Sequence, residues 1–235
     1  MTIDGKTIVV TGGFGALGAA VAEAAAGRGA SVAALDCAHD APVGLAERLG
    51  PEGLLIGGVD LALPHAAQRA MAEVAERFGR IDALLNIAGG FNWEKIADAP
   101  NAETWERMYA LNLQTTLNAS RAALPHLLET GAGRIVNVGA ESALRAAAGM
   151  GAYAASKSAV HRLTESLADE LKLRGVTVNA VLPSIIDTPA NRRDMPTAEF
   201  DRWVAPADLA AIMLFLASDE ARAITGALIP VTGRM

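Results

Sequence analysis

The stretch "YAASK" holds two side chains that could move a proton, Tyr153 and Lys157. On a helix these residues are four positions apart and lie on one face. A phenol ordinarily has a pKa of about 10, which is too high for easy proton exchange at neutral pH. A neighbouring ammonium favours the phenolate and lowers that pKa. The pair predicts a general acid, Tyr153, with Lys157 as its electrostatic partner; the alternative is a Tyr and a Lys that merely share a helix surface.

A glycine-rich turn near the N-terminus could bind phosphate. "TGGFGALG" has the spacing G-x-G-x-x-G between a predicted strand and a predicted helix. Glycines allow a tight turn and let backbone amides approach a pyrophosphate, and the helix N-terminus adds a positive dipole end. The alternative is a glycine turn that binds nothing. The expected contacts are Gly13, Phe14, Gly15, Ala16, Leu17 and Gly18.

Asp36 ends the next predicted strand, at the distance expected for an acid that binds a ribose. Its carboxylate would accept hydrogen bonds from the adenosine 2′-hydroxyl and repel a 2′-phosphate. Neither Phe14 nor Cys37 offers a compensating cation. These residues predict NAD(H) as the cofactor rather than NADP(H). We expect Cys37 to be a small packing residue beside the adenosine.

The elements that must position these residues alternate along the chain. Short apolar runs without polar alternation are typical of strands buried on both faces. Their alternation with helical stretches predicts an α/β fold with a parallel sheet and helices on both faces. The predicted strands are Thr7–Val10, Ser31–Leu35, Leu54–Gly57, Ala83–Asn86, Arg134–Val138, Thr177–Val181 and Leu228–Val231. The predicted helices are Gly15–Arg28, Pro64–Phe78, Ala102–Leu111, Thr115–Glu129, Met150–Arg174 and Ala207–Ala217.

The length of 235 residues fits one domain over 1–235, with no repeat or linker. The alternation falters only at residues 187–206, a polar segment with several prolines that follows a strand end. Ligands of open α/β sheets bind outside the carboxyl ends of strands. We therefore expect a substrate lid at 187–206.

Composition excludes several classes of protein. The net charge of −6 and the absence of a basic cluster make nucleic acid and acidic membranes poor partners. An acid, Asp4, stands where a signal peptide would be basic, and the apolar run Leu209–Ala217 is too short to span a bilayer. We expect a cytoplasmic protein that acts on a small molecule. The single cysteine excludes an internal disulfide, and four scattered histidines predict no metal site.

The motifs "TGGFGALG", "NIAGG", "LNLQTT" and "YAASK" occur in order, and with them the chain resembles the short-chain dehydrogenase/reductase family from Lys6 to about Gly233. The resemblance implies a single Rossmann-type doubly wound domain with a seven-stranded parallel sheet in the order 3-2-1-4-5-6-7. It also implies a homo-oligomer, dimer or tetramer, that pairs through Thr115–Glu129 and Met150–Arg174 and through the last helix and strand. Most short members have glycine in place of Ala16.

The resemblance also implies further site residues. Asn112 would orient a water in the proton relay, and Lys157 would reach the nicotinamide ribose. Asp60 and Leu61 would flank the adenine. Further contacts with the cofactor, or support for the strand beside it, are implied for Asn86, Ala88, Gly89, Pro183, Ile186 and Thr188.

The family's catalytic serine lies thirteen residues before the tyrosine, and that position holds Ala140. Removal of one donor to a developing oxyanion typically lowers the rate by about 100- to 1000-fold. Ala140 therefore argues against an ordinary ketone reductase. Ser142 could reach in from an altered turn, or it is a loop serine without a role. His161, one turn beyond Lys157, is expected to be a packing or interface residue.

One branch of the family lacks this serine, the dihydropteridine reductase-like branch. The chain resembles it in "GGFGALG", in "GAESAL" and over Ala180–Trp203. The end, "FLASDEARAITGALIPVTG", resembles instead the 3-oxoacyl thioester and sugar reductases. Three functions stay open: an NADH-dependent reductase of a dihydropterin-like or other conjugated acceptor, a carbonyl reductase or alcohol dehydrogenase such as a 3-oxoacyl thioester reductase, and a catalytically impaired dinucleotide-binding sensor or scaffold.

Overall fold

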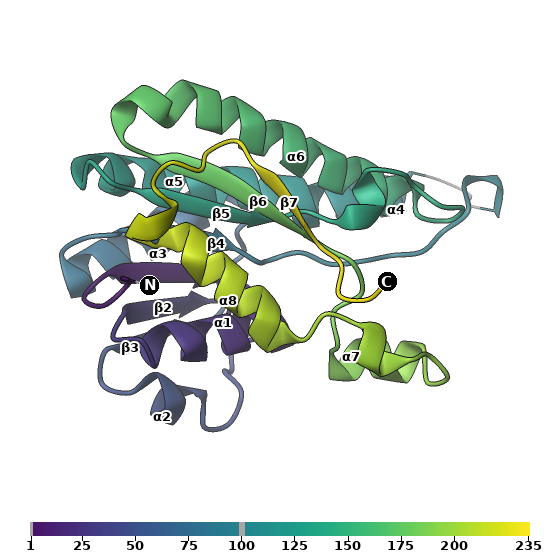
Figure 1. Cartoon of the computed structure of the whole chain (residues 1–235), viewed down its shortest axis with the longest axis horizontal. Helices are drawn as coiled ribbons and strands as arrows, with labels where there is room; N and C mark the ends of the chain where they lie inside the picture. The colour runs from purple at the N-terminus through teal and green to yellow at the C-terminus, as the bar shows by residue number, and fades with distance from the viewer. Residues whose placement is uncertain (1, 99–101) are drawn as a thin grey trace.

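The computed structural model describes residues 2–98 and 102–235. Their strands form one parallel sheet in the order β3-β2-β1-β4-β5-β6-β7 (Figure 1). This order and the parallel pairing confirm the predicted doubly wound α/β architecture. The strands are β1 Thr7–Thr11, β2 Ser31–Leu35, β3 Gly53–Ile56, β4 Ala83–Asn86, β5 Arg134–Val138, β6 Thr177–Pro183 and β7 Leu228–Val231.

The central strands are apolar throughout because both of their faces are covered. Successive strand residues point to opposite faces, so Val9 enters one apolar cluster and Val10 the other. Leu84 and Leu85 divide in the same way. One cluster contains side chains of α1, α2 and α8, and the other contains side chains of α3, α5 and α6. The two layers of helices are visible on either side of the sheet in Figure 1.

The helices include two that the sequence did not predict, α2 and α7. Each has only five or six residues, too few for a 3.6-residue apolar period to be recognised. No helix of the described ranges is long and apolar enough to cross a membrane. The α-helices are α1 Ala16–Ala26, α2 Leu45–Leu49, α3 Pro64–Phe78, α4 Glu103–Met108, α5 Thr115–Glu129, α6 Gly151–Leu171, α7 Pro189–Asp194 and α8 Pro206–Ala217.

The helix predicted over Ala102–Leu111 is instead a short α4 followed by a π-helical turn, Tyr109–Gln114, that leads directly into α5. Such turns have i→i+5 hydrogen bonds and occur frequently at functional sites. A repeat of apolar residues cannot reveal this change of period, because only six residues adopt it.

The segment 187–206 follows the carboxyl end of β6 and is more ordered than a solvated loop. It contains α7 and a 3₁₀ turn, Phe200–Arg202, and Ile186 pairs with Val204 in an isolated parallel bridge. Trp203 is only 6% exposed, so its ring anchors the segment.

Candidate active site

The predicted general acid lies in the first turn of α6. Tyr153 is partly buried, and its ring meets Phe91 edge-on with 5.0 Å between the centroids. Burial raises the pKa of Tyr153 to about 12. In the protein without cofactor this pKa therefore shifts in the direction opposite to the expected one, because removal from water disfavours the phenolate.

Lys157 lies one turn further along α6 and is 5% exposed. Its Nζ donates to the carbonyl of Val138 at 2.7 Å, at the carboxyl end of β5. Burial lowers the pKa of Lys157 to about 8. The hydrogen bond to Val138 uses one of the three N–H groups of the ammonium and fixes its position beside the strand end.

Asn112 lies in the π-helical turn and is 1% exposed. Its amide accepts from Gly90 N at 2.9 Å and donates to Gly90 O at 3.1 Å and to Ser156 Oγ at 3.0 Å. A Cβ on Gly89 would lie 2.6 Å from Asn112 Oδ1 and 3.3 Å from Lys157 Nζ. The three motifs that contain Gly89, Asn112 and Lys157 therefore meet at one place. The sequence did not single out Ser156, although its position three residues after Tyr153 places it on the same face of α6.

Ala140 follows β5 in extended backbone and is 2% exposed. Its N–H donates to His161 Nε2 at 3.3 Å. Position 140 therefore has neither a hydroxyl nor a free amide to donate to a substrate oxygen. Ser142 lies two residues on, in the partly exposed 3₁₀ turn Glu141–Ala143.

The glycine turn leaves an open cradle in front of α1. A Cβ on Gly13 would lie 2.6 Å from Ala34 Cβ, and a Cβ on Gly18 would lie 2.0 Å from Gly12 O, so neither position tolerates a side chain. At Gly15 the nearest atom would be 3.4 Å away. No side chain caps the first turn of α1, which leaves its amide groups for a ligand. The cradle fits a pyrophosphate.

Asp36 lies at the end of β2 beside this cradle. Its carboxylate accepts from Phe14 N at 3.0 Å and from Ala38 N at 3.0 Å, which hold it in place. Cys37 is exposed in the protein alone, on the side of Asp36 where the adenosine is expected, so its packing against the adenosine stays a prediction. The residues after Cys37 form a surface loop. Partial burial and the negative charge of Asp36 raise the pKa of the Cys37 thiol.

Asp60 and Leu61 lie in the loop after β3, with Asp60 accepting from Ala62 N at 2.9 Å. Asn118 of α5 donates to the carbonyls of Leu61 and Ala62 at 2.9 Å each. The sequence offers no signal for Asn118, because the contact joins residues far apart in the chain.

Asn86 donates to Asn137 Oδ1 at 2.9 Å, which joins the ends of β4 and β5. Ala88 N donates to Thr11 Oγ1 at 3.1 Å, at the end of β1. On the other side of the site, Pro183 ends β6, and Thr188 caps α7 by accepting from Asn191 N at 3.2 Å. The strand ends therefore bring these predicted residues to one edge of the sheet.

Comparison with known proteins decides the family. The family profile described as short chain dehydrogenase matches residues 6–199. The chain is a short chain dehydrogenase. It is 36% identical over 241 residues to the meso-2,3-butanediol dehydrogenase of Serratia marcescens, covering 99% of this chain and 95% of that protein. It is 32% identical over 243 residues to the 3-oxoacyl-(acyl-carrier-protein) reductase of Vibrio cholerae serotype O1, covering 100% and 99%.

A solved structure of similar fold is the 3-ketoacyl-(acyl-carrier-protein) reductase of Brucella melitensis complexed with NADH. The TM-score is 0.89 at 27% identity, and the alignment covers 99% of each chain. These relatives confirm the resemblance at the level of the family. They are dehydrogenases and reductases of other kinds, so they do not support the dihydropteridine reductase-like branch.

Two aromatic residues of this dehydrogenase were missed by sequence reasoning. Phe91 is 56% exposed and Trp93 is 55% exposed, directly after "NIAGG". Trp93 Nε1 donates to Ala148 O at 3.0 Å and Glu94 N donates to Gly149 O at 2.8 Å, so this segment is tied to the loop before α6. Aromatic residues just beyond a strand end are the signal that could have identified them.

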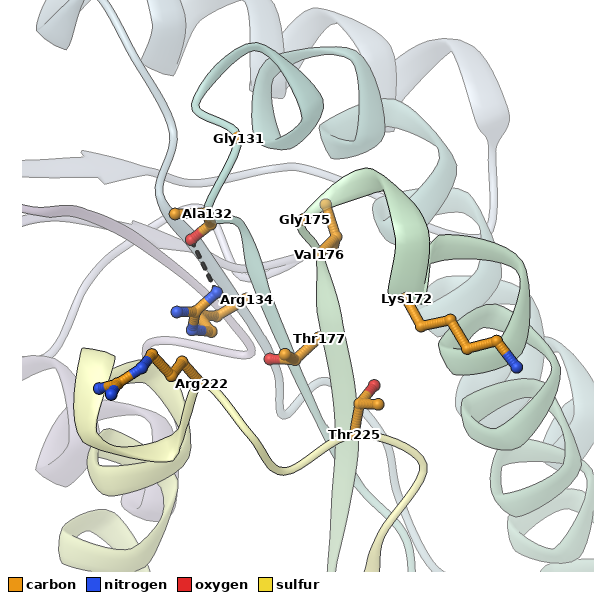
Figure 2. Close-up of a pocket in the computed structure, with 9 residues that line it drawn as sticks. All are labelled: Gly131, Ala132, Arg134, Lys172, Gly175, Val176, Thr177, Arg222 and Thr225. Atoms are coloured by element: carbon orange, nitrogen blue, oxygen red, sulfur yellow. Dashed lines mark hydrogen bonds between the residues drawn. The ribbon is translucent and has the colours of Figure 1, made fainter.

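A pocket of about 300 Å³ lies at the opposite, amino end of β5 and β6 in this dehydrogenase (Figure 2). Arg134, Lys172 and Arg222 line it. Arg134 is bound to the carbonyls of Ala132 and Gly133, and Figure 2 shows Lys172 and Arg222 directed away from the centre. Because this pocket lies at the amino ends of the strands and the candidate active site lies at their carboxyl ends, the two are separate.

Proposed function

We propose that this dehydrogenase transfers hydride from NADH to a conjugated acceptor, such as a dihydropterin-like C=N system, with Tyr153 as general acid. One observation carries the proposal: Ala140 presents only a buried methyl group, and its amide is bound to His161. The place where a second donor would meet a substrate oxygen therefore has none.

The chemistry of the acceptor decides whether that second donor matters. The bound nicotinamide would supply the hydride. A ketone then develops negative charge on oxygen, and a missing donor raises the barrier by about 3–4 kcal/mol. A conjugated acceptor spreads its charge over the ring and takes a proton at nitrogen. Tyr153 alone can deliver that proton, because its phenol is protonated at neutral pH and lies at the site.

Phe91 supports a planar acceptor. Its ring is more than half exposed, and its edge-on contact with Tyr153 places an aromatic surface beside the proton donor. A flat conjugated ring can stack on such a surface, with a gain of about 0.5–1.5 kcal/mol beyond area burial.

Asp36 supports NAD(H) over NADP(H). Its carboxylate is already held by Phe14 N and Ala38 N, and it would meet the adenosine ribose. The amides of the turn from Gly13 to Gly18 would hold the pyrophosphate. Lys157 would hold the nicotinamide ribose, and Asn112 the water of the relay. The relative from Brucella melitensis was solved with NADH, which supports the same choice.

A second candidate is a carbonyl reductase or alcohol dehydrogenase, such as a 3-oxoacyl thioester reductase. The names of the relatives from Serratia and Vibrio favour it. Ser142 would then have to supply the missing donor. A dinucleotide-binding scaffold is disfavoured, because Tyr153, Lys157 and Asn112, the residues of the proposed relay, are all present and a protein that only binds has no evident need for them. For either enzyme we propose a cytoplasmic homo-oligomer, dimer or tetramer.

The test is NADH oxidation with quinonoid dihydropterin, a ferricyanide-type acceptor and a panel of small ketones. We expect turnover of the conjugated acceptors and slow turnover of ketones. Ala140→Ser should raise ketone turnover about 10- to 100-fold and change pterin turnover little. Ser142→Ala is the matched variant and should change neither. Rapid ketone turnover that Ser142→Ala abolishes would establish the second candidate, and NADH binding without any turnover would establish the scaffold.

A further inference from the structure

Two side chains of α6 hold the backbone that follows β5. Lys157 Nζ donates to Val138 O at 2.7 Å, and His161 Nε2 accepts from Ala140 N at 3.3 Å. Lys157 and His161 are four residues apart, so they lie one above the other on one face of the helix. We call these two hydrogen bonds the α6 clasp. The clasp grips a carbonyl and an amide that are two residues apart, on either side of Gly139.

The close packing at Gly139 shows that the fit is specific. A Cβ on Gly139 would lie 2.4 Å from His161 Nε2 and 2.7 Å from its Cδ2. No side chain fits there without displacing the imidazole. A glycine in the strand-to-turn connection is therefore required by the approach of His161. His161 itself is 2% exposed, so the ring has a single environment and few alternative positions.

The charge state of His161 matches this role. Burial and the nearby charges of Arg162 and Lys157 lower its pKa to about 4, so the ring is neutral at physiological pH. A neutral imidazole has one acceptor nitrogen and one N–H. Because Nε2 accepts from Ala140, the hydrogen lies on Nδ1. A protonated ring would have no acceptor, and the clasp would lose its second bond.

We propose that His161 is a positioning residue for the proton transfer: through the α6 clasp it fixes the turn after β5 relative to Tyr153, which lies two turns earlier on the same helix. This inference rests on the proposed reductase function. The clasp connects α6, which carries Tyr153, to the turn that would face the substrate. Residue 140 in that turn is an alanine, so no side-chain donor there could offset a shift of the backbone.

Loss of the acceptor should affect chemistry more than cofactor binding. Without His161 Nε2 the amide of Ala140 is buried and unpaired, so the turn relaxes to find another acceptor. A displacement of about 1 Å at a reacting geometry can lower the rate by about 100-fold. The glycine turn lies between β1 and α1, and Asp36 follows β2. These contacts with the dinucleotide are away from the clasp, and Lys157 is kept, so we expect little change in the affinity for the dinucleotide.

The experiment compares His161→Leu with His161→Gln. Leucine has a similar volume and no acceptor, whereas the side-chain oxygen of glutamine can reach the position of Nε2. For His161→Leu we expect kcat with the best acceptor to fall at least 10-fold, while the Kd for NADH stays within 2-fold. His161→Gln should recover at least half of the wild-type kcat. Hydrogen exchange of the Ala140 amide should be fast in His161→Leu and slow in the wild type and in His161→Gln.

Several results would overturn the proposal. Equal kcat values in the wild type and both variants would overturn it. Equal decreases of kcat in both variants, in proportion to a decrease in their thermal stability, would also overturn it. Slow exchange of the Ala140 amide in His161→Leu would show that the clasp does not hold it. A wild-type protein that binds NADH but reduces no acceptor would contradict the proposed function instead, and exchange at Ala140 would still decide whether the clasp exists.

Discussion

At the scale of single residues, Tyr153 and Lys157 show how one cause shifts two pKa values in opposite directions. Removal from water disfavours the charged form of each group, which raises the pKa of the phenol and lowers the pKa of the amine. Tyr153 therefore remains an acid throughout the neutral range. Lys157 changes its charge close to physiological pH.

The pH dependence of reduction should follow Lys157. Its pKa is about 8, so the ammonium is present below pH 8 and is lost above it. We expect the kcat of NADH-dependent reduction to fall as the pH rises through about 8. Lys157→Arg keeps its charge over this range and should show a lower but flatter profile. A wild-type rate that is constant from pH 6 to 10 would contradict the role of the ammonium.

Asp36 should govern the choice of dinucleotide. Asp36→Ala removes the carboxylate that repels a 2′-phosphate, so we expect the ratio of kcat/KM for NADPH to that for NADH to rise about 10- to 100-fold. The matched control is Asp40→Ala, an exposed acid four residues on that should leave the ratio unchanged. Steady-state kinetics with both cofactors provides the measurement, and an unchanged ratio in Asp36→Ala would remove the basis for NAD(H) preference.

At the scale of elements, the π-helical turn is the device that presents Asn112 to the strand end. One amide side chain satisfies both the N–H and the C=O of Gly90 and also reaches Ser156. A regular α-helix over Tyr109–Gln114 would rotate the following side chains by a fraction of a turn and break this set of bonds.

Asn112→Leu should therefore lower the stability of the protein as well as its catalytic rate. The change leaves polar groups of Gly90 without their partner, which costs about 2–3 kcal/mol and lowers the Tm by roughly 4–12 °C for a chain of this size. Tyr109→Leu, in the same turn but exposed, is the control and should shift the Tm by less than about 2 °C. Thermal denaturation followed by circular dichroism measures both. Equal shifts would mean that the turn does not depend on Asn112.

At the scale of the whole molecule, His161 links stability to pH. Its pKa is about 4 in the folded chain, against about 6.5 when unfolded. Between these values the unfolded chain binds a proton that the folded chain does not, so stability falls as the pH drops from 6.5 to 4. We expect this contribution to be about 1–3 kcal/mol. Denaturant unfolding of wild type and His161→Gln at pH 7 and 5 isolates it, and equal losses in both proteins would contradict it.

The outer strand β7 and the exposed Phe215 indicate where copies of the chain could associate. β7 is the last strand, and Phe215 on the neighbouring α8 is 36% exposed. Unpaired strand edges and exposed aromatic side chains are typical of contacts between copies. We predict a homotetramer, and Phe215→Asp should reduce it to a dimer in light scattering with size-exclusion chromatography. Val43→Asp, at a residue that is 99% exposed on the far loop, should not. A monomeric wild type would contradict the prediction.

Much of the architecture could be predicted from the sequence. Ser31–Leu35, Ala83–Asn86, Arg134–Val138 and Leu228–Val231 are strands with the predicted bounds, because uninterrupted apolar runs between helical stretches leave few other solutions. The meeting of "NIAGG" with "YAASK" also followed from parallel topology, since the strands that lead into these motifs end at one edge. The short helices α2 and α7 and the π-helical turn could not be predicted, because they are shorter than the periods that identify helices.

The sequence by itself determined the parallel sheet, the glycine cradle and the tyrosine–lysine pair, because each depends on residue types at short, regular spacings. Only the tertiary structure decided how those groups behave. Burial sets the direction of the Tyr153 pKa, and the approach of α6 to β5 pairs His161 with the amide of Ala140. Both depend on what surrounds a group in space, and dielectric environment and long-range contacts leave no mark in local spacing.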